Sequence, residues 1–227
     1  MSLRLVSSTP SVIGVLDLQG GVQEHLEHLD VIGIPYKRVK QASDFPDLAG
    51  LIIPGGESTC VARLLDIFQM KDPIINAHRN GMKIWGTCAG TILLAKEVVG
   101  EIPCLGLIDI VVERNSFGSQ LDSFVDEAII PAVATEPIPL TFIRAPKIIH
   151  VGNDVKVLLK KDDYIAAAEN ENVLVTVFHP ELTGNLAFHR YFALKCGLNP
   201  AIDVDDDTNP HWNNYSWTKH TRIADKY

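Results

Sequence analysis

The sequence predicts one α/β domain with a mostly parallel central sheet, flanking helices and an antiparallel extension. In the N-terminal half, short apolar runs alternate with helix-compatible stretches and are separated by glycine-rich turns. After Val99, strand-like runs follow one another with few helices between them. The 227 residues are 46% hydrophobic and 21% charged, a composition that can bury one large core.

The N-terminal half alternates strand and helix patterns. Apolar runs predict strands at 12–16, 36–40, 51–53 and 83–85. Helix-compatible stretches lie at 22–32, 59–68, 73–80 and 91–99. Gly20-Gly21 and Pro54-Gly55-Gly56 are turn signals between these runs. The alternation predicts right-handed βαβ units on a parallel sheet.

The C-terminal half is richer in strands. Strand patterns lie at 108–112, 140–143, 155–159, 164–168 and 173–178, and we expect some of them to form the antiparallel extension. The proline-rich segment 126–139 has no pattern that fixes a register. An amphipathic helix at 185–196 closes the core with an apolar set comprising Leu186, Phe188, Tyr191, Phe192 and Leu194.

These patterns predict three parts. A leader at 1–11 is expected to be flexible, the folded domain covers 12–197, and a tail covers 198–227. The tail is polar, with an acidic run at 203–207 and aromatic residues that include Trp212 and Trp217. Its role does not follow from its sequence, since docking on the surface, contact with a partner and disorder all fit.

Composition excludes several classes of function. The net charge of −8 and the lack of a basic cluster argue against nucleic-acid binding. No stretch approaches the roughly 18 to 20 apolar residues that span a bilayer. The N-terminus lacks the apolar core of a secretory signal, so we expect a cytoplasmic protein.

The cysteines and most histidines give no metal-binding pattern. Four widely spaced cysteines form no Cys-x-x-Cys pair, so neither a metal site nor a disulfide framework is expected. His25 and His28 lie three apart in a helix, but without a third nearby ligand they are interpreted as solvent-facing. His150 and His189 are expected at the core edge or the surface.

Cys88 is the strongest candidate nucleophile. It follows an apolar strand within Gly86-Thr87-Cys88-Ala89-Gly90 and precedes a helix. Small neighbours permit a sharp strand-to-helix turn, and the start of the helix directs N–H groups and a positive dipole end toward the sulfur. This setting favours the thiolate, which is the nucleophilic form. A buried structural cysteine is the alternative at this point.

A thiol nucleophile needs a base and a group that orients the base. His179 follows an apolar strand, and Glu181 lies two residues further on. A bend at Pro180 can bring the Glu181 carboxylate to the far nitrogen of the imidazole, which would fix its tautomer and stabilise the imidazolium. A strand-end histidine beside a solvated glutamate is the simpler interpretation.

Glycine-containing turns follow two other strands of the predicted parallel sheet. In proteins with parallel sheets, active sites lie at the carboxyl ends of the strands. Gln19 stands in the first, and Gly55-Gly56 precede a helix in the second. Tandem glycines expose N–H groups that can hold an oxyanion. An ordinary turn with a Ser58 or Thr59 helix cap is the alternative.

Together these motifs carry a family resemblance. Gly86-Thr87-Cys88-Ala89-Gly90 with His179-Pro180-Glu181 resembles the class I, triad-type glutamine amidotransferases, which have a flavodoxin-like fold. The motifs at 18–20, 54–59, 114–120 and 142–146 make the chain more similar to the glutaminase subunits of pyridoxal 5'-phosphate synthases. The resemblance covers about 12–196 in order and leaves the tail unmatched.

The resemblance implies a role for each matching position. Cys88 matches the nucleophile, and His179 and Glu181 complete the triad. Backbone groups of Gly56 and Ala89 are implied in the oxyanion hole, and Gln19 matches a position near the partner interface. The matching glutamine contacts are Gly56, Glu57, Ser58, Arg114, Ile143 and Arg144. A free amino acid requires such an arginine for its carboxylate and an acceptor for its ammonium.

The resemblance implies hydrolysis of L-glutamine through a cysteinyl thioester, without metal or organic cofactor. The ammonia would pass to a synthase (lyase) subunit in a large hetero-oligomer that makes vitamin B6. A glutaminase subunit serving another amidotransferase is an alternative that the motifs at 114–120 and 142–146 disfavour. The complete triad disfavours a non-catalytic regulatory subunit, and the two arginines suit a free amino acid better than the peptide of a protease.

Overall fold

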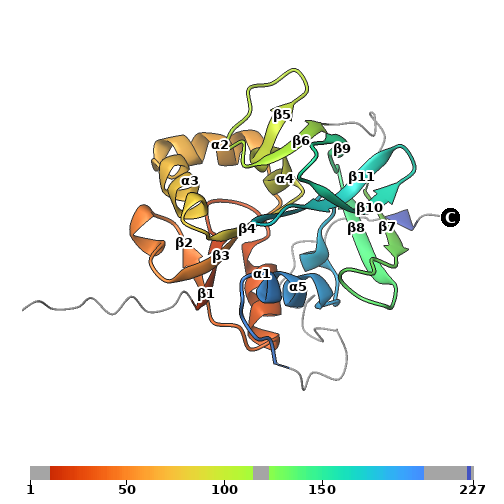
Figure 1. Ribbon diagram of the computed structural model, residues 1–227, viewed down its shortest axis with the longest axis horizontal. Helices are drawn as coiled ribbons and strands as arrows, with labels where there is room; N and C mark the ends of the chain where they lie inside the picture. Colours follow the sequence, from red (N-terminus) through yellow and green to blue (C-terminus); the bar gives the residue numbers. More distant parts are fainter. Residues whose placement is uncertain (1–10, 115–122, 202–223, 226–227) are drawn as a thin grey trace, which may run out of the picture.

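A computed structural model describes residues 11–114, 123–201 and 224–225 of the chain. It contains a ten-stranded mixed sheet and a separate three-stranded sheet (Figure 1). The larger sheet has a parallel half and a mostly antiparallel half, with helices on both faces of the parallel half (Figure 1). The predicted fold class, an α/β domain with an antiparallel extension, is confirmed.

The parallel half has the strand order β2-β1-β3-β4-β12. Every neighbouring pair in this set is parallel. This 2-1-3-4-5 pattern is that of flavodoxin-like sheets, in which ligands bind beyond the carboxyl ends of the strands. The strands are β1 (Val12–Leu16), β2 (Tyr36–Val39), β3 (Leu48–Ile53), β4 (Lys83–Thr87) and β12 (Val173–Thr176).

Two layers of helices cover this half (Figure 1). Helices α1 (Val22–Val31) and α5 (Ala187–Lys195) pack together on one face. The opposite face carries α2 (Ser58–Ile67), α3 (Lys71–Arg79) and α4 (Ala89–Leu94). A short 3-10 helix, η1 (Ala42–Asp44), follows β2. On the α1–α5 side, the fully buried Trp85 of β4 contacts the rings of Phe188 and Phe192.

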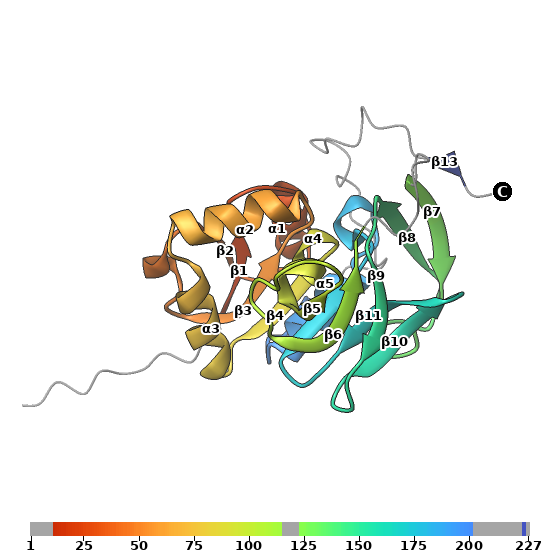
Figure 2. The same ribbon diagram turned by 90° about the horizontal axis from the view of Figure 1, so that it is seen from above.

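The remaining strands extend the sheet away from the parallel half (Figure 2). They continue the order as β11-β9-β6-β5, and β10 pairs with β11. These strands are β5 (Ala95–Val98), β6 (Ile108–Glu113), β9 (Lys147–Val151), β10 (Lys156–Lys161) and β11 (Tyr164–Glu169). The smaller sheet contains β7 (Ser123–Ala128), β8 (Ile138–Ile143) and β13 (Ala224–Asp225).

The structure corrects several predicted elements. The helix expected at 91–99 ends at Leu94, because Ala95 is extended (φ −62°, ψ 140°) and begins β5. Strands β7 and β9 were not predicted, since cross-strand pairing rather than a strong local pattern defines them. Helix α5 buries most of its expected apolar set, but Leu194 is 58% exposed.

The histidine interpretation is also wrong at three positions. His25 and His28 on α1 are completely buried rather than solvent-facing, and so is His189 on α5. Burial is tolerated because their ring nitrogens bond to one another and to the carbonyl oxygen of Thr183. His150 on β9 is exposed, as expected.

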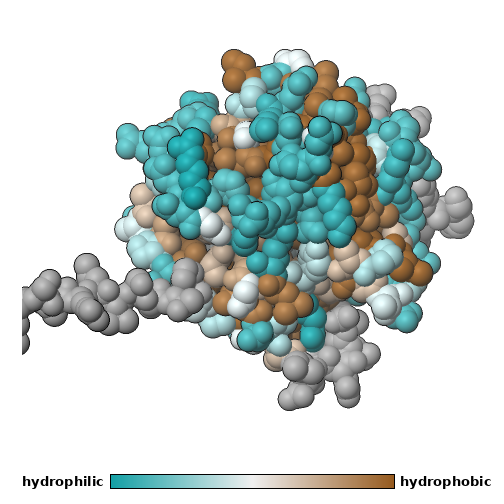
Figure 3. Space-filling view, viewed as in Figure 1, coloured by the Kyte–Doolittle hydropathy of each residue, from teal (hydrophilic) through white to brown (hydrophobic). Residues whose placement is uncertain are grey.

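The surface in Figure 3 has both hydrophilic and apolar areas. The face in Figure 3 is largely hydrophilic over α2 and α3, with apolar surface toward β6 and β9. Exposed apolar side chains include Ile102 and Ile149, and isolated ones of this kind are common on soluble domains. No helix among the described residues is long and apolar enough to cross a membrane.

Candidate active site

The carboxyl ends of four adjacent parallel strands open into one cavity of about 530 Å³. Gln19 follows β1, Gly55 follows β3, Cys88 follows β4 and His179 follows β12. Four chain segments far apart in sequence therefore meet at one edge of the sheet. Every residue to which the family resemblance gives a role lines this cavity: Gln19, Gly56, Glu57, Ser58, Cys88, Ala89, Arg114, Ile143, Arg144, His179 and Glu181.

Cys88 occupies a strained turn between β4 and α4. Its backbone has φ 47° and ψ −103°, outside the conformations that residues with a Cβ prefer. The turn is held because the Cys88 N–H donates to the carbonyl oxygen of Thr176 at 2.8 Å. Gly90 lets α4 pack against β3, since a Cβ there would collide with the Ile53 carbonyl oxygen. The thiol is consequently fixed at the cavity wall and is only 6% exposed.

His179 lies between Cys88 and Glu181. Its Nδ1 is 2.7 Å from Oε1 of Glu181, and its ring lines the same cavity as Cys88. Burial alone would lower the pKa of His179, but the charges and hydrogen bonds of Cys88 and Glu181 raise that pKa well above 6.5. Burial opposes ionisation of Glu181, but His179 and His25 hold the pKa of this carboxyl below its usual value. A thiol, an imidazole and a carboxylate in this order have the geometry that a nucleophile, its base and an orienting group require.

The end of β8 forms a further wall of the cavity. The His179 N–H donates to the Thr141 carbonyl oxygen at 2.8 Å, which ties the histidine loop to β8. The thiol of Cys88 donates to the Ile143 carbonyl oxygen at 3.8 Å. Arg144 follows with a left-handed backbone (φ 43°) and an exposed side chain. Residues 115–120, which contribute to the sequence motif at 114–120, lie outside the described residues.

The Gly55-Gly56 loop is held from two sides. The Gly55 N–H donates to Oγ1 of Thr87 at 2.8 Å, and its carbonyl oxygen accepts from the Gly21 N–H at 3.1 Å. Because C=O and N–H point oppositely in a trans peptide, the Gly56 N–H is directed away from Gly21. The Glu57 N–H donates to Oε1 of Gln19 at 2.8 Å. Rotation of the Gly55–Gly56 peptide therefore requires loss of the Gly21 contact.

Glu57 and Arg114 lie together at the cavity mouth. Glu57 caps α2, because its carboxylate accepts from the N–H groups of Thr59 and Cys60. Burial would raise the pKa of Glu57, but these hydrogen bonds and the Arg114 charge lower it below the usual value. Arg114 donates from one nitrogen to both carboxylate oxygens of Glu101, at 2.8 and 2.7 Å. A cation, an anion and the start of a helix thus lie together at the edge of the cavity.

Comparison with known proteins agrees with this geometry. The family model described as "SNO glutamine amidotransferase family" matches residues 15–197. The chain belongs to this family. The SNO family assignment covers every strand of the parallel half except the first residues of β1, and it includes all the cavity-lining residues named above.

Curated relatives support a narrower position within the SNO family. The chain is 59% identical over 214 residues to "Pyridoxal 5'-phosphate synthase subunit PdxT" of Syntrophus aciditrophicus, covering 93% of this chain and 95% of the relative. It is 47% identical over 181 residues to the subunit of the same name from Clostridium acetobutylicum. That match covers 79% of this chain and 97% of the relative.

Solved structures support the SNO family fold. A crystal structure described as glutamine amidotransferase superposes with a TM-score of 0.77 at 39% identity, covering 82% of this chain and 99% of that one. The structure of PurLQS from Thermotoga maritima has a TM-score of 0.60 at 19% identity. It covers 82% of this chain and 99% of that one, and shows a shared fold alone.

The sequence interpretation missed three residues around the SNO family site. Thr87 receives the Gly55 N–H, Glu101 holds Arg114, and His25 faces Glu181. Thr87 is adjacent in sequence to Cys88, and this position was a usable signal. Glu101 lies in the connection after β5, whose course the sequence pattern did not indicate. The helical pattern around His25 was interpreted with this residue on the wrong side of its helix.

Proposed function

We propose that this chain is the glutaminase subunit of a pyridoxal 5'-phosphate synthase. It hydrolyses L-glutamine to L-glutamate and ammonia and delivers the ammonia to a synthase subunit for vitamin B6 biosynthesis. The observation that carries the proposal is the 59% identity over 93% of the chain to a PdxT subunit. The buried Cys88–His179–Glu181 arrangement supplies the chemistry that such a glutaminase needs.

The first half-reaction forms a thioester. The Cys88 thiolate attacks the side-chain amide carbon of glutamine, and the carbonyl oxygen becomes an oxyanion. Backbone N–H groups of Gly56 and Ala89 are the proposed donors to this oxygen. The imidazolium of His179 protonates the amide nitrogen, the C–N bond breaks, and ammonia leaves behind a glutamyl thioester on Cys88.

The second half-reaction releases glutamate. The now neutral His179 takes a proton from water, which attacks the thioester carbonyl, and the tetrahedral intermediate expels the Cys88 thiolate. Glu181 orients the imidazole in both halves and stabilises its charged form through the 2.7 Å contact. The protons balance, because the proton given to ammonia in the first half is recovered from water in the second.

The proposed glutamine contacts line the cavity beside Cys88. We assign Arg114 and Arg144 to the α-carboxylate and Glu57 to the α-ammonium, because their charges complement these groups. Ser58, Ile143 and the Gly56 backbone complete the set. All of them line the same cavity as Cys88, which supports a substrate the size of a free amino acid.

The partner completes the proposal. We assign the chain to a large cytoplasmic hetero-oligomer with synthase (lyase) subunits, and Gln19 to the partner side of the site. Gln19 already bonds to the backbone of Glu57 beside the Gly55-Gly56 loop. A partner that moved Gln19 would therefore act directly on the proposed oxyanion donors.

The test is glutamate release by the full-length chain, measured with and without the cognate synthase subunit. We expect turnover that rises with the partner and is abolished in Cys88→Ala. Cys60→Ala is the matched control, because Cys60 is an exposed free cysteine on α2 outside the cavity. Residual turnover in Cys88→Ala would remove Cys88 as the nucleophile, and activity indifferent to the partner would undercut the synthase assignment.

A further inference from the structure

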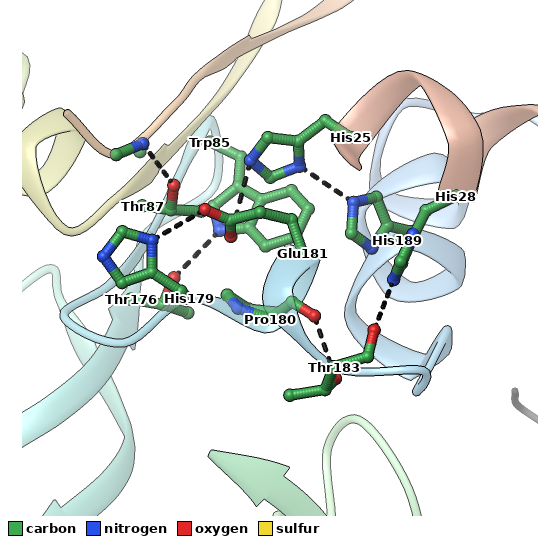
Figure 4. A network of polar contacts seen from close by, with 12 residues as sticks. His25, His28, Trp85, Thr87, Thr176, His179, Pro180, Glu181, Thr183 and His189 are labelled. Carbon is green, nitrogen blue, oxygen red and sulfur yellow. Dashed lines mark hydrogen bonds and ion pairs between the residues drawn. The ribbon is translucent and has the colours of Figure 1, made fainter. Parts of the chain in front are cut away.

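A cluster of three buried histidines lies behind the triad. His25 and His28 come from α1 and His189 from α5, and all three are fully buried (Figure 4). The catalytic scheme above uses none of them. Buried ionisable groups without a partner destabilise a fold, so the contacts that the cluster makes require an explanation.

The cluster meets the triad at Glu181. One oxygen of this carboxylate, Oε1, contacts His179, while the other, Oε2, lies 3.6 Å from Nε2 of His25 (Figure 4). Within the described residues, neither Oε2 of Glu181 nor Nε2 of His25 has a hydrogen-bond partner. The two unsatisfied atoms face each other at slightly more than hydrogen-bond distance. Catalytic hydrogen bonds are often long in unliganded sites and shorten in the reacting complex.

The far side of His25 determines its tautomer. Its Nδ1 lies 2.8 Å from Nε2 of His189, so one of these nitrogens donates and the other accepts. If His25 donated, its Nε2 lone pair would face the Glu181 carboxylate and His189 would carry a buried, unpaired Nδ1–H. If His189 donates, His25 directs an Nε2–H at Glu181 and only a lone pair on His189 stays unpaired. Donation by His189 therefore avoids both a lone pair that faces the carboxylate and a buried N–H without an acceptor.

Charge supports the same arrangement. Burial lowers the pKa of His25 to about 4, although Glu181 raises it in part, and His179 lowers it further. Burial also lowers the pKa of His28 to about 4 and that of His189 well below 6.5. The titratable groups around His25 are Glu181, His179, His189, His28 and, on its own helix turn, Glu24. At neutral pH His25 is therefore a neutral donor that does not compete with the His179 cation.

We propose that His25 is a positioning residue of the triad, held by His189 as the Nε2–H tautomer so that it orients Glu181 and supports its ionised form. Through Glu181, His25 affects how firmly the His179 imidazole is oriented and how strongly its charged form is stabilised. This inference deepens the proposed glutaminase function and rests on it for its effect on turnover. The tautomer and the ionisation of the triad can be measured without turnover.

The direct test is the protonation pattern of the imidazole nitrogens in the ¹⁵N-labelled full-length chain. Long-range ¹H–¹⁵N correlation spectra at pH 6 to 8 should show His25 protonated on Nε2 and unprotonated on Nδ1. His25→Gln identifies the signals by their loss. Protonation of His25 on Nδ1 alone would overturn the proposal, whether or not the chain is a glutaminase.

Substitutions of His25 then distinguish a role in orienting Glu181 from a role in core packing alone. His25→Leu fills the space but removes the donor, so the ionised form of Glu181 is less stable and more base is needed to reach it. We expect the acid limb of kcat/KM for the complex to move to higher pH by at least about half a unit, and kcat to fall about tenfold. KM for glutamine should stay within about twofold, because His25 does not line the cavity.

Two amide replacements of His25 test which ring nitrogen is needed for the wild-type pH profile. His25→Gln places an amide N–H near the original Nε2 and should restore most of the wild-type pH profile. His25→Asn places its amide near the original Nδ1 and should resemble His25→Leu. His28→Leu is the matched control for burial, because His28 donates to Thr183 rather than facing Glu181. It should lower stability without moving the acid limb.

A readout independent of turnover separates this inference from the proposed function. The alkylation rate of Cys88 by iodoacetamide, followed by peptide mass spectrometry, should show the same acid-limb shift in His25→Leu. If wild-type complex releases no glutamate yet this shift is present, the function fails and the positioning role stands. If the profiles of His25→Leu, His25→Asn and wild type coincide, His25 is only a packed core residue.

Discussion

Nδ1 of His179 lies 2.7 Å from Oε1 of Glu181, and a single short turn creates this contact. Pro180 begins the 3-10 helix η2 (Pro180–Leu182), and its fixed φ turns the chain directly after His179. The Leu182 N–H donates back to the His179 carbonyl oxygen at 3.2 Å. The proposed base and orienter are thus held by local geometry, whereas the proposed nucleophile follows a strand about ninety residues earlier.

Glu181→Gln should test this contact with little change in shape. The amide keeps the volume but removes a charge that, after that of Cys88, helps to raise the pKa of His179, so the imidazolium is less well stabilised. We expect kcat to fall on the order of 10³-fold, with KM changed far less. Steady-state glutamine hydrolysis by the complex measures both. A loss below tenfold would mean that Glu181 does not orient the base.

The parallel half of the fold could be predicted because its signals are local. The central strands there are short apolar runs with glycine or proline soon after them, as Pro54-Gly55-Gly56 follow β3. The extension could be predicted only in outline. The sequence of β5 resembles the end of a helix, since Ala95 and Val98 are buried at helix-compatible spacing and only pairing with β6 makes them a strand.

The site could be predicted to a similar extent. Residues that follow strands of the parallel half were found because the topology forces them to one edge. His25 was misplaced because its side chain is polar, although its spacing from Val22 and Leu29 puts it on the buried face of α1. Its partner there, His189, comes from α5 and lies far away in the sequence. Long-range partners of this kind leave no periodic signal.

The histidine cluster should make the fold sensitive to mild acid. The pKa values of His25 and His28 are lowered by burial from 6.5 to about 4, so between these values the unfolded chain binds more protons than the folded one. The free energy of unfolding should therefore fall as pH drops from 6.5 toward 4, by about 1.4 kcal/mol per pH unit for each histidine. Urea unfolding at pH 7, 6 and 5 measures this slope.

His179 and Glu181 also contribute to the pH dependence of stability, and two variants isolate the contribution of the histidine cluster. The raised pKa of His179 contributes stability that is lost as pH rises above 6.5, and the lowered pKa of Glu181 adds a loss only below about 4.5. Between pH 6.5 and 4, His28→Gln should reduce the slope by the contribution of one histidine, about 1.4 kcal/mol per pH unit. His150→Gln should not change it, since His150 is exposed on β9. A stability that does not vary between pH 6.5 and 5 would contradict the prediction.

The backbone strain at Cys88 should be measurable as stability. Cys88→Ala keeps a Cβ at φ 47° and so keeps the strain, whereas Cys88→Gly removes it. Both variants lose the thiol and its contact with His179. We expect Cys88→Gly to be more stable than Cys88→Ala by about 1 to 2 kcal/mol, although glycine normally destabilises a folded chain relative to alanine. Denaturant unfolding of the two variants would show the opposite order if the turn carries no strain.

Arg144→Ala should separate substrate binding from structure. Arg144 is exposed, lines the cavity and has a left-handed backbone, and alanine keeps the Cβ so that backbone strain is unchanged. If its guanidinium holds the glutamine carboxylate, KM should rise about 10- to 100-fold with a much smaller change in kcat. Arg63→Ala is the matched control, because Arg63 is exposed on α2 and does not line the cavity. Equal kinetics in the two variants would return Arg144 to the role of an ordinary surface arginine.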